Sequence, residues 1–97
     1  MPHYITLVNF TDQGIRAIKE TRQRAEAFEH AAKAAGGSVK EILWTQGAYD
    51  MVCVMEAPDD NVATALLLNA YRLGNIRGQT LRAFTASEIE TILAKTN

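Results

Sequence analysis

The sequence predicts an α+β domain in which four strands and two long helices follow the order βαββαβ, with a short helix at the end. Four short segments rich in β-branched and aromatic residues alternate with longer segments whose apolar residues recur at helical spacing. The 97 residues are 47% apolar and 22% charged, which is sufficient for one hydrophobic core and argues against disorder. We therefore expect a single domain over residues 1–97.

The first strand is predicted over residues 3–10, where the apolar residues repeat with a period near two. Thr11 then provides a helix N-cap, and apolar residues recur at steps of three and seven until Gly36 ends the pattern. This apolar stripe is interrupted at Thr21 and Arg22. A second cap at that point would divide the segment into a short helix and a longer one.

The second and third strands are predicted over residues 38–45 and 50–56. Four residues that include Gly47 join them, and this spacing indicates an antiparallel hairpin. The charged pair Lys40 and Glu41 suits a strand at the edge of the sheet, because edge strands commonly carry charges.

The second long helix is predicted to begin at Asp59, a good N-cap, and to end at Gly74. Residues 76–84 form the predicted fourth strand. Thr85 and Glu88 have the spacing of a capping box, which predicts a last short helix. Two right-handed crossovers then give the strand order 4-1-3-2 of a ferredoxin-like sheet, with both long helices on one face.

The other face of this sheet is predicted to be uncovered and apolar. The third strand is apolar from Met51 to Met55, so both of its faces favour burial. If Ile5 and Leu7 face the helices, then the side chains on the open face of the first strand are those of Tyr4, Thr6, Val8 and Phe10. Such a face predicts a homo-oligomer, a dimer or higher, in which two sheets close a barrel-like assembly. The alternative is that the last helix folds back over the sheet.

Composition excludes several functional classes. A net charge of −1 and a pI near 6.1 speak against nucleic acid as a partner, because such binding depends on neutralising many phosphates. The lone Cys53 cannot form an internal disulfide, and no signal peptide or long apolar run is present, so we expect a cytoplasmic protein without a membrane segment. The only histidines, His3 and His30, lack further ligands at metal spacing, so we expect no metal and no cofactor.

The run from Trp44 to Asp50 is the strongest candidate for a ligand-binding site. Tyr49 can donate a hydrogen bond beside Asp50, which can accept one, and Trp44 offers a flat apolar wall. In the alternative interpretation the aromatic residues bury surface, while Asp50 caps turn amides or pairs with an arginine.

Arg82 is the fourth candidate, because it shares the predicted open face with Tyr4 and Thr6. An arginine in that position must be paired or must bind an anion. Alternatively, its stem packs on the sheet while its guanidinium stays in water.

Taken together, these motifs resemble the GYD domain family over nearly the whole chain. The residues that carry the resemblance are Tyr4, Leu7, Asn9–Asp12, Gly14, Trp44, Thr45, Gly47, Tyr49, Asp50, Glu56–Asp60, Leu73–Asn75, Arg77 and Thr80–Phe84. The resemblance implies a small bacterial α+β protein of the dimeric α/β-barrel kind, in a family without an established activity. It also implies a fold shared with antibiotic-biosynthesis monooxygenases, muconolactone isomerases and ligand-sensing regulator domains, which have unrelated functions.

Three functional hypotheses remain open at this point. The first is a homo-oligomeric module that binds a small organic ligand between the sheet and its partner elements, with Trp44, Tyr49, Asp50 and Arg82 at the mouth. The second is a small cofactor-free enzyme, such as an isomerase or oxygenase, that uses Tyr49 and Asp50 to transfer protons. The third is a purely structural or assembly protein.

Overall fold

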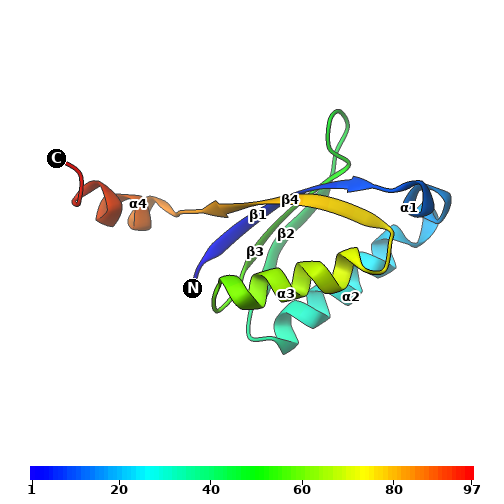
Figure 1. The fold of residues 1–97 in the computed structure, drawn as a ribbon, viewed down its shortest axis with the longest axis horizontal. Helices are drawn as coiled ribbons and strands as arrows, with labels where there is room; N and C mark the ends of the chain where they lie inside the picture. Colours follow the sequence, from blue (N-terminus) through cyan, green and yellow to red (C-terminus); the bar gives the residue numbers. More distant parts are fainter.

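The computed structural model describes residues 1–97 as a mixed α+β fold in which one antiparallel sheet carries helices on one of its faces (Figure 1). The strands are β1 (His3–Phe10), β2 (Ser38–Trp44), β3 (Met51–Glu56) and β4 (Ile76–Ala83). The helices are α1 (Asp12–Arg16), the 3₁₀ turn η1 (Ile18–Glu20), α2 (Thr21–Ala34), α3 (Asp60–Tyr71) and α4 (Ala86–Leu93). None of them combines the length and apolar content needed to span a membrane.

The strands lie in the order β2-β3-β1-β4, which confirms the predicted order. β1 is central and pairs antiparallel with β3 on one side and with β4 on the other. β2 lies at the edge, as its charges predict, and its register with β3 shifts between Val39 and Glu41. The two long helices, α2 and α3, lie on the same side of the sheet (Figure 1).

The predicted helix caps at Thr11, Asp59 and Thr85 are present, whereas the second cap expected at Thr21 and Arg22 is absent, because Thr21 is already the first residue of α2 and no side chain caps that helix. The Thr11 hydroxyl accepts a hydrogen bond from the Gly14 amide, and the Asp59 carboxylate accepts one from the Val62 amide. The first helical segment is divided, as its interrupted stripe indicates, and α2 begins at Thr21. These features depend on neighbours in the sequence, which is why local patterns predict them.

The prediction of which β1 side chains face the helices is wrong. Tyr4, Thr6 and Val8 are only 4%, 1% and 4% exposed, and they lie beneath the helices, whereas Ile5 and Leu7 point to the open face. Two hydrogen bonds make this arrangement possible. The Tyr4 hydroxyl donates to the Asp60 carboxylate on α3 at 2.5 Å, and the hydroxyls of Thr6 and Thr80 lie 3.0 Å apart. The polar atoms of the covered face are therefore paired.

The open face of the sheet also carries apolar side chains. Strand alternation and register place six aliphatic side chains on it, those of Ile5, Leu7, Leu43, Val52, Val54 and Leu81. Helix α4 does not cover them, because it extends away from the end of β4 (Figure 1). The alternative prediction, that the last helix folds back over the sheet, is therefore wrong.

Candidate functional site

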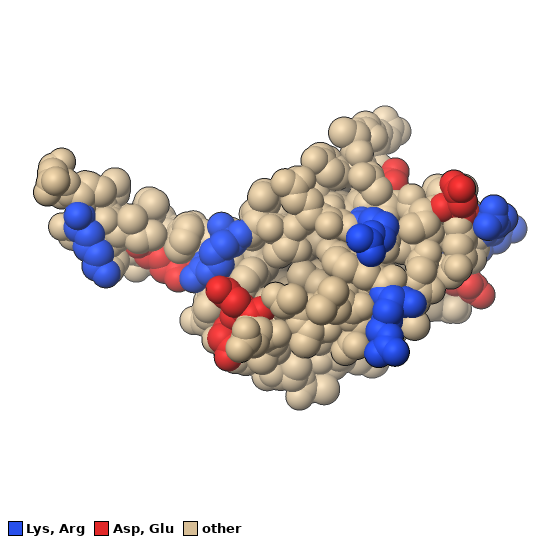
Figure 2. Space-filling view, in the orientation of Figure 1, with Lys and Arg blue, Asp and Glu red and all other residues tan.

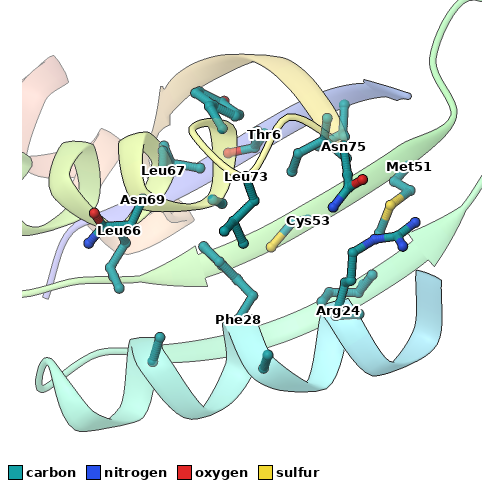
Figure 3. A pocket seen from close by; sticks show the side chains of 18 of the residues that line it. Thr6, Arg24, Phe28, Met51, Cys53, Leu66, Leu67, Asn69, Leu73 and Asn75 are labelled. Atoms are coloured by element: carbon teal, nitrogen blue, oxygen red, sulfur yellow. The ribbon is translucent and has the colours of Figure 1, made fainter. Parts of the chain in front are cut away.

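A cavity of about 250 Å³ lies between the sheet and helices α2 and α3, and we call it the apolar chamber (Figure 3). Of the nineteen residues that line it, fourteen are hydrophobic. Phe28 reaches into it from α2, Leu66 borders it from α3, and Cys53 forms part of its floor on β3. An engineered apolar cavity of about 150 Å³ accommodates benzene, so this chamber has room for a larger organic molecule.

Arg24 supplies a cationic group to the wall of this apolar chamber. Its Nη1 atom donates to the Ala17 carbonyl at 3.1 Å and lies 3.6 Å from the Glu20 carboxylate. Its Nη2 atom is buried and has no hydrogen-bond partner. A buried guanidinium N–H without a partner is unfavourable, and a ligand oxygen in the chamber would satisfy it.

Cys53 contributes apolar surface to the chamber rather than a nucleophile. Burial, together with the charge of Glu29, raises the pKa of its thiol from 9.0 to about 11. The thiolate is the reactive form of cysteine, so at neutral pH this side chain stays protonated. Cys53 is one of the buried residues of the hydrophobic core.

A second, more polar cavity of about 430 Å³ lies between α3 and β4, and we call it the polar cleft. Its polar groups come from Tyr4, Asp60, Thr64, Tyr71, Thr80 and Arg82. Burial and the hydrogen bond to Asp60 raise the pKa of Tyr4 from 10.0 to about 12. The cleft therefore holds a neutral tyrosine beside a carboxylate at neutral pH.

Tyr71 and Leu67 line both cavities, so they form the wall between the apolar chamber and the polar cleft. The position of Tyr71 depends on a glycine in β4. A Cβ atom at Gly78 would lie only 2.6 Å from the Tyr71 hydroxyl oxygen. Glycine thus allows this hydroxyl to rest against the strand.

The structure does not gather the four predicted site residues around one cavity. The prediction that Arg82 lies on the open face is wrong, because it is paired with Tyr4 and shares the covered face with it. Arg82 lines the polar cleft, and its guanidinium lies 5.6 Å from the centre of the Tyr4 ring and 4.6 Å from that of Phe84. Trp44 does not line the apolar chamber. Its indole N–H donates at 3.0 Å to the hydroxyl of Thr21, which does line it. Tyr49 and Asp50 line neither of these two cavities.

Asp50 instead fastens the β2–β3 hairpin to β1. Its carboxylate accepts a hydrogen bond from the Phe10 amide at 2.9 Å, and its own amide donates to the Val8 carbonyl at 2.8 Å. Tyr49 reaches across the sheet, and its hydroxyl lies 3.5 Å from the Gln79 side-chain oxygen. These contacts correspond to the alternative interpretation, in which Asp50 holds the hairpin in place.

The sequence analysis missed the residues that line the chamber. Arg24 and Phe28 are four residues apart on α2, so both belong on one helix face, and this spacing was a usable signal. Thr6 and Tyr71 gave a weaker signal. The position of Thr6 depends on Thr80, which lies in another strand far along the chain, and that of Tyr71 depends on the absence of a side chain at Gly78 in the same strand.

The fold and the chamber define a small α+β domain with a cavity of ligand-binding size between sheet and helices. The GYD domain family model matches residues 4–93, and the chain belongs to that family. It is also similar to the crystal structure of TTHA0845 from Thermus thermophilus, with a TM-score of 0.56 and 22% sequence identity. That similarity covers 89% of this chain and 96% of the other, and it concerns the fold alone. No curated protein matches this chain.

Proposed function

We propose that this GYD domain is a homo-oligomeric binding protein for a small amphipathic organic acid. The apolar part of the ligand occupies the apolar chamber, and its acidic group bonds to Arg24. The observation that carries the proposal is the buried, unpartnered Nη2 atom of Arg24 in the wall of a mostly apolar cavity, in which Arg24 is the only charged side chain. Apolar pockets with a few well-placed polar groups are the usual form of small-molecule sites.

The expected affinity for the ligand follows from two contributions, the burial of its apolar surface and the bond between its acidic group and Arg24. Burying roughly 200 Å² of apolar ligand surface contributes about 5 kcal/mol at about 25 cal/mol per Å². A charge-assisted hydrogen bond to Arg24 adds about 1.5 to 3 kcal/mol. The sum, about 6.5 to 8 kcal/mol, limits the affinity to a dissociation constant in the micromolar range, because association also costs translational and rotational freedom.

The proposed assembly is a ferredoxin-like domain that forms a dimer of the α/β-barrel type through its open face. Six aliphatic side chains on that face have no cover within the chain. A two-fold axis lets one such face serve both partners. In this assembly the apolar chamber lies on the opposite side of each sheet, so ligand binding and association use different surfaces.

The test compares two fluorescent probes that share an apolar body. 8-Anilinonaphthalene-1-sulfonate carries an acidic group, and N-phenyl-1-naphthylamine does not. We expect Arg24→Gln to weaken binding of the sulfonate about 10- to 100-fold, because the charge-assisted bond is lost, and to leave binding of the amine unchanged. Arg22→Gln is the matched control, because Arg22 lies on the same helix and is exposed.

Alkylation of Cys53 locates the probe, because this thiol lines the chamber. Saturating sulfonate should slow its reaction with iodoacetamide in alkaline solution, where a fraction of this thiol is ionised. Equal losses of sulfonate binding in both arginine variants, or unaltered Cys53 alkylation, would contradict the proposal. A loss confined to Arg82→Gln would assign the acidic group to the polar cleft instead.

A further inference from the structure

Helix α4 is an unpartnered element of this chain. It follows β4 after two residues and extends beyond the end of the sheet, away from α2 and α3 (Figure 1). None of its residues is buried. Its start is fixed by a complete capping box, in which the Thr85 hydroxyl accepts from the Glu88 amide and the Glu88 carboxylate accepts from the Thr85 amide.

One side of α4 is apolar although it contacts solvent. Ile89, Ile92 and Leu93 have the spacing that places side chains on one face of a helix, and they are 40%, 37% and 56% exposed. Phe84, just before the helix, is half exposed as well. An isolated helix of eight residues is not stable in water, so burial of this apolar face must supply the missing stability.

The open face of the sheet also has apolar side chains that no other part of the chain covers. Four strands about 4.8 Å apart and about 20 Å long give a flat footprint of roughly 400 Å². A stable interface buries about 800 Å² of accessible surface on each partner, a measure that includes side-chain relief and is therefore larger than a flat footprint of the same patch. The apolar face of α4 is the further surface that a dimer through the open face can use, and the direction of α4 keeps it away from the open face of its own chain (Figure 1).

We infer that α4 is an exchanged arm, whose apolar side packs on a second copy of this chain at the open face of the sheet. The inference rests on the assembly proposed above, which it extends by making each α4 part of the partner's interface. The open face and the apolar side of α4 belong to the same chain, so a two-fold axis buries both surfaces of both copies at once.

The charged groups near α4 leave this apolar side free. His3 at the start of β1 lies 3.1 Å from the Glu56 carboxylate and 4.0 Å from that of Glu88, so Glu88, one of the two acidic residues of α4, faces the root of the helix. Figure 2 shows acidic atoms at this root and a basic side chain farther along the arm. The side chains of Ile89, Ile92 and Leu93 therefore remain free to contact the partner.

The first measurement is sedimentation equilibrium of the full chain and two variants of α4. Ile92→Glu places a charge on the apolar side, and we expect the dimer dissociation constant to rise at least about tenfold. Thr91→Glu is the matched control on the neighbouring position, and it should leave the constant unchanged. Leu93→Gln provides a second apolar-side variant without an added charge.

The second measurement is an isotope-filtered NMR experiment on a mixture of ¹³C-labelled and unlabelled chains. Contacts between α4 methyl groups of one chain and open-face methyl groups of the other would support the exchange. A dimer that persists in Ile92→Glu and Leu93→Gln, without such contacts, overturns the arm and leaves the open-face assembly standing. A monomer at every concentration contradicts the assembly itself.

Discussion

Asp50 shows how a residue in a ligand-like motif can serve the fold. Its carboxylate receives the Phe10 amide, so it joins the hairpin to the central strand. Asp50→Asn keeps the volume and loses the charge, and we expect the free energy of unfolding to fall by about 1 kcal/mol. In a domain of this size that lowers the thermal midpoint by about 4 to 8 °C, measurable by circular dichroism.

Tyr49→Phe is the control for Asp50→Asn, because it removes only a hydroxyl at a long contact to Gln79. We expect its midpoint to stay close to that of the wild type. An unchanged midpoint in Asp50→Asn, together with lost probe binding, would instead support Asp50 as a ligand-binding residue.

Tyr4 predicts a loss of stability at alkaline pH. Its pKa is raised to about 12 in the folded chain, chiefly by burial and then by the bond to Asp60, against 10.0 for an unperturbed tyrosine. Between these two values the unfolded chain releases a proton that the folded chain retains. The contribution of Tyr4 is therefore complete below pH 10 and is lost as the pH rises toward 12.

Tyr4→Phe removes this titration, and urea unfolding at several pH values measures the effect. The wild type should lose stability from about pH 10 upward more steeply than the variant. The variant should be less stable at neutral pH, because the Asp60 carboxylate loses its donor. Parallel curves in the alkaline range would show that another group controls the alkaline transition.

At the scale of elements, sequence patterns predicted what depends on near neighbours. Strand and helix positions, the break before Thr21 and the capping box at Thr85 all follow from residues a few positions apart. The β1–β3 pairing followed from topology, because right-handed crossovers leave few alternatives.

The orientation of β1 could not be predicted in the same way. Apolar character alone predicts that Ile5 and Leu7 face the helices. The face that is buried instead carries Tyr4 and Thr6, whose hydroxyls form hydrogen bonds with residues of α3 and β4. Those partners, Asp60 and Thr80, lie more than fifty residues away in sequence. The chamber and its unpartnered Arg24 nitrogen were missed for the same reason, because they arise only when helices and sheet are placed together.

At the scale of the whole molecule, the chain is close to neutral, with a net charge of −1. On the face that Figure 2 shows, basic side chains are scattered rather than gathered in a stripe. The apolar side chains of the open face and of α4 are therefore the features that favour a partner. The orientation of β1 places Ile5 and Leu7 on the open side, where they add to its apolar side chains.

Val54→Lys tests the open face itself. Val54 lies on the open side of β3, between Ile5 of β1 and Glu41 of β2. In a monomer the lysine stem can lie along the sheet with its ammonium group in water, so the fold should persist. In a dimer the same charge would be buried without a partner, and we expect dissociation to a sedimentation mass near 10.7 kDa.

Leu68→Lys is the matched control for Val54→Lys, because Leu68 is 59% exposed on α3, on the helix side of the sheet. Its mass should equal that of the wild type. Dissociation in Leu68→Lys but not in Val54→Lys would move the interface to the helices. The partner would then lie next to the polar cleft, which Leu68 lines, and association and ligand binding would no longer use separate surfaces.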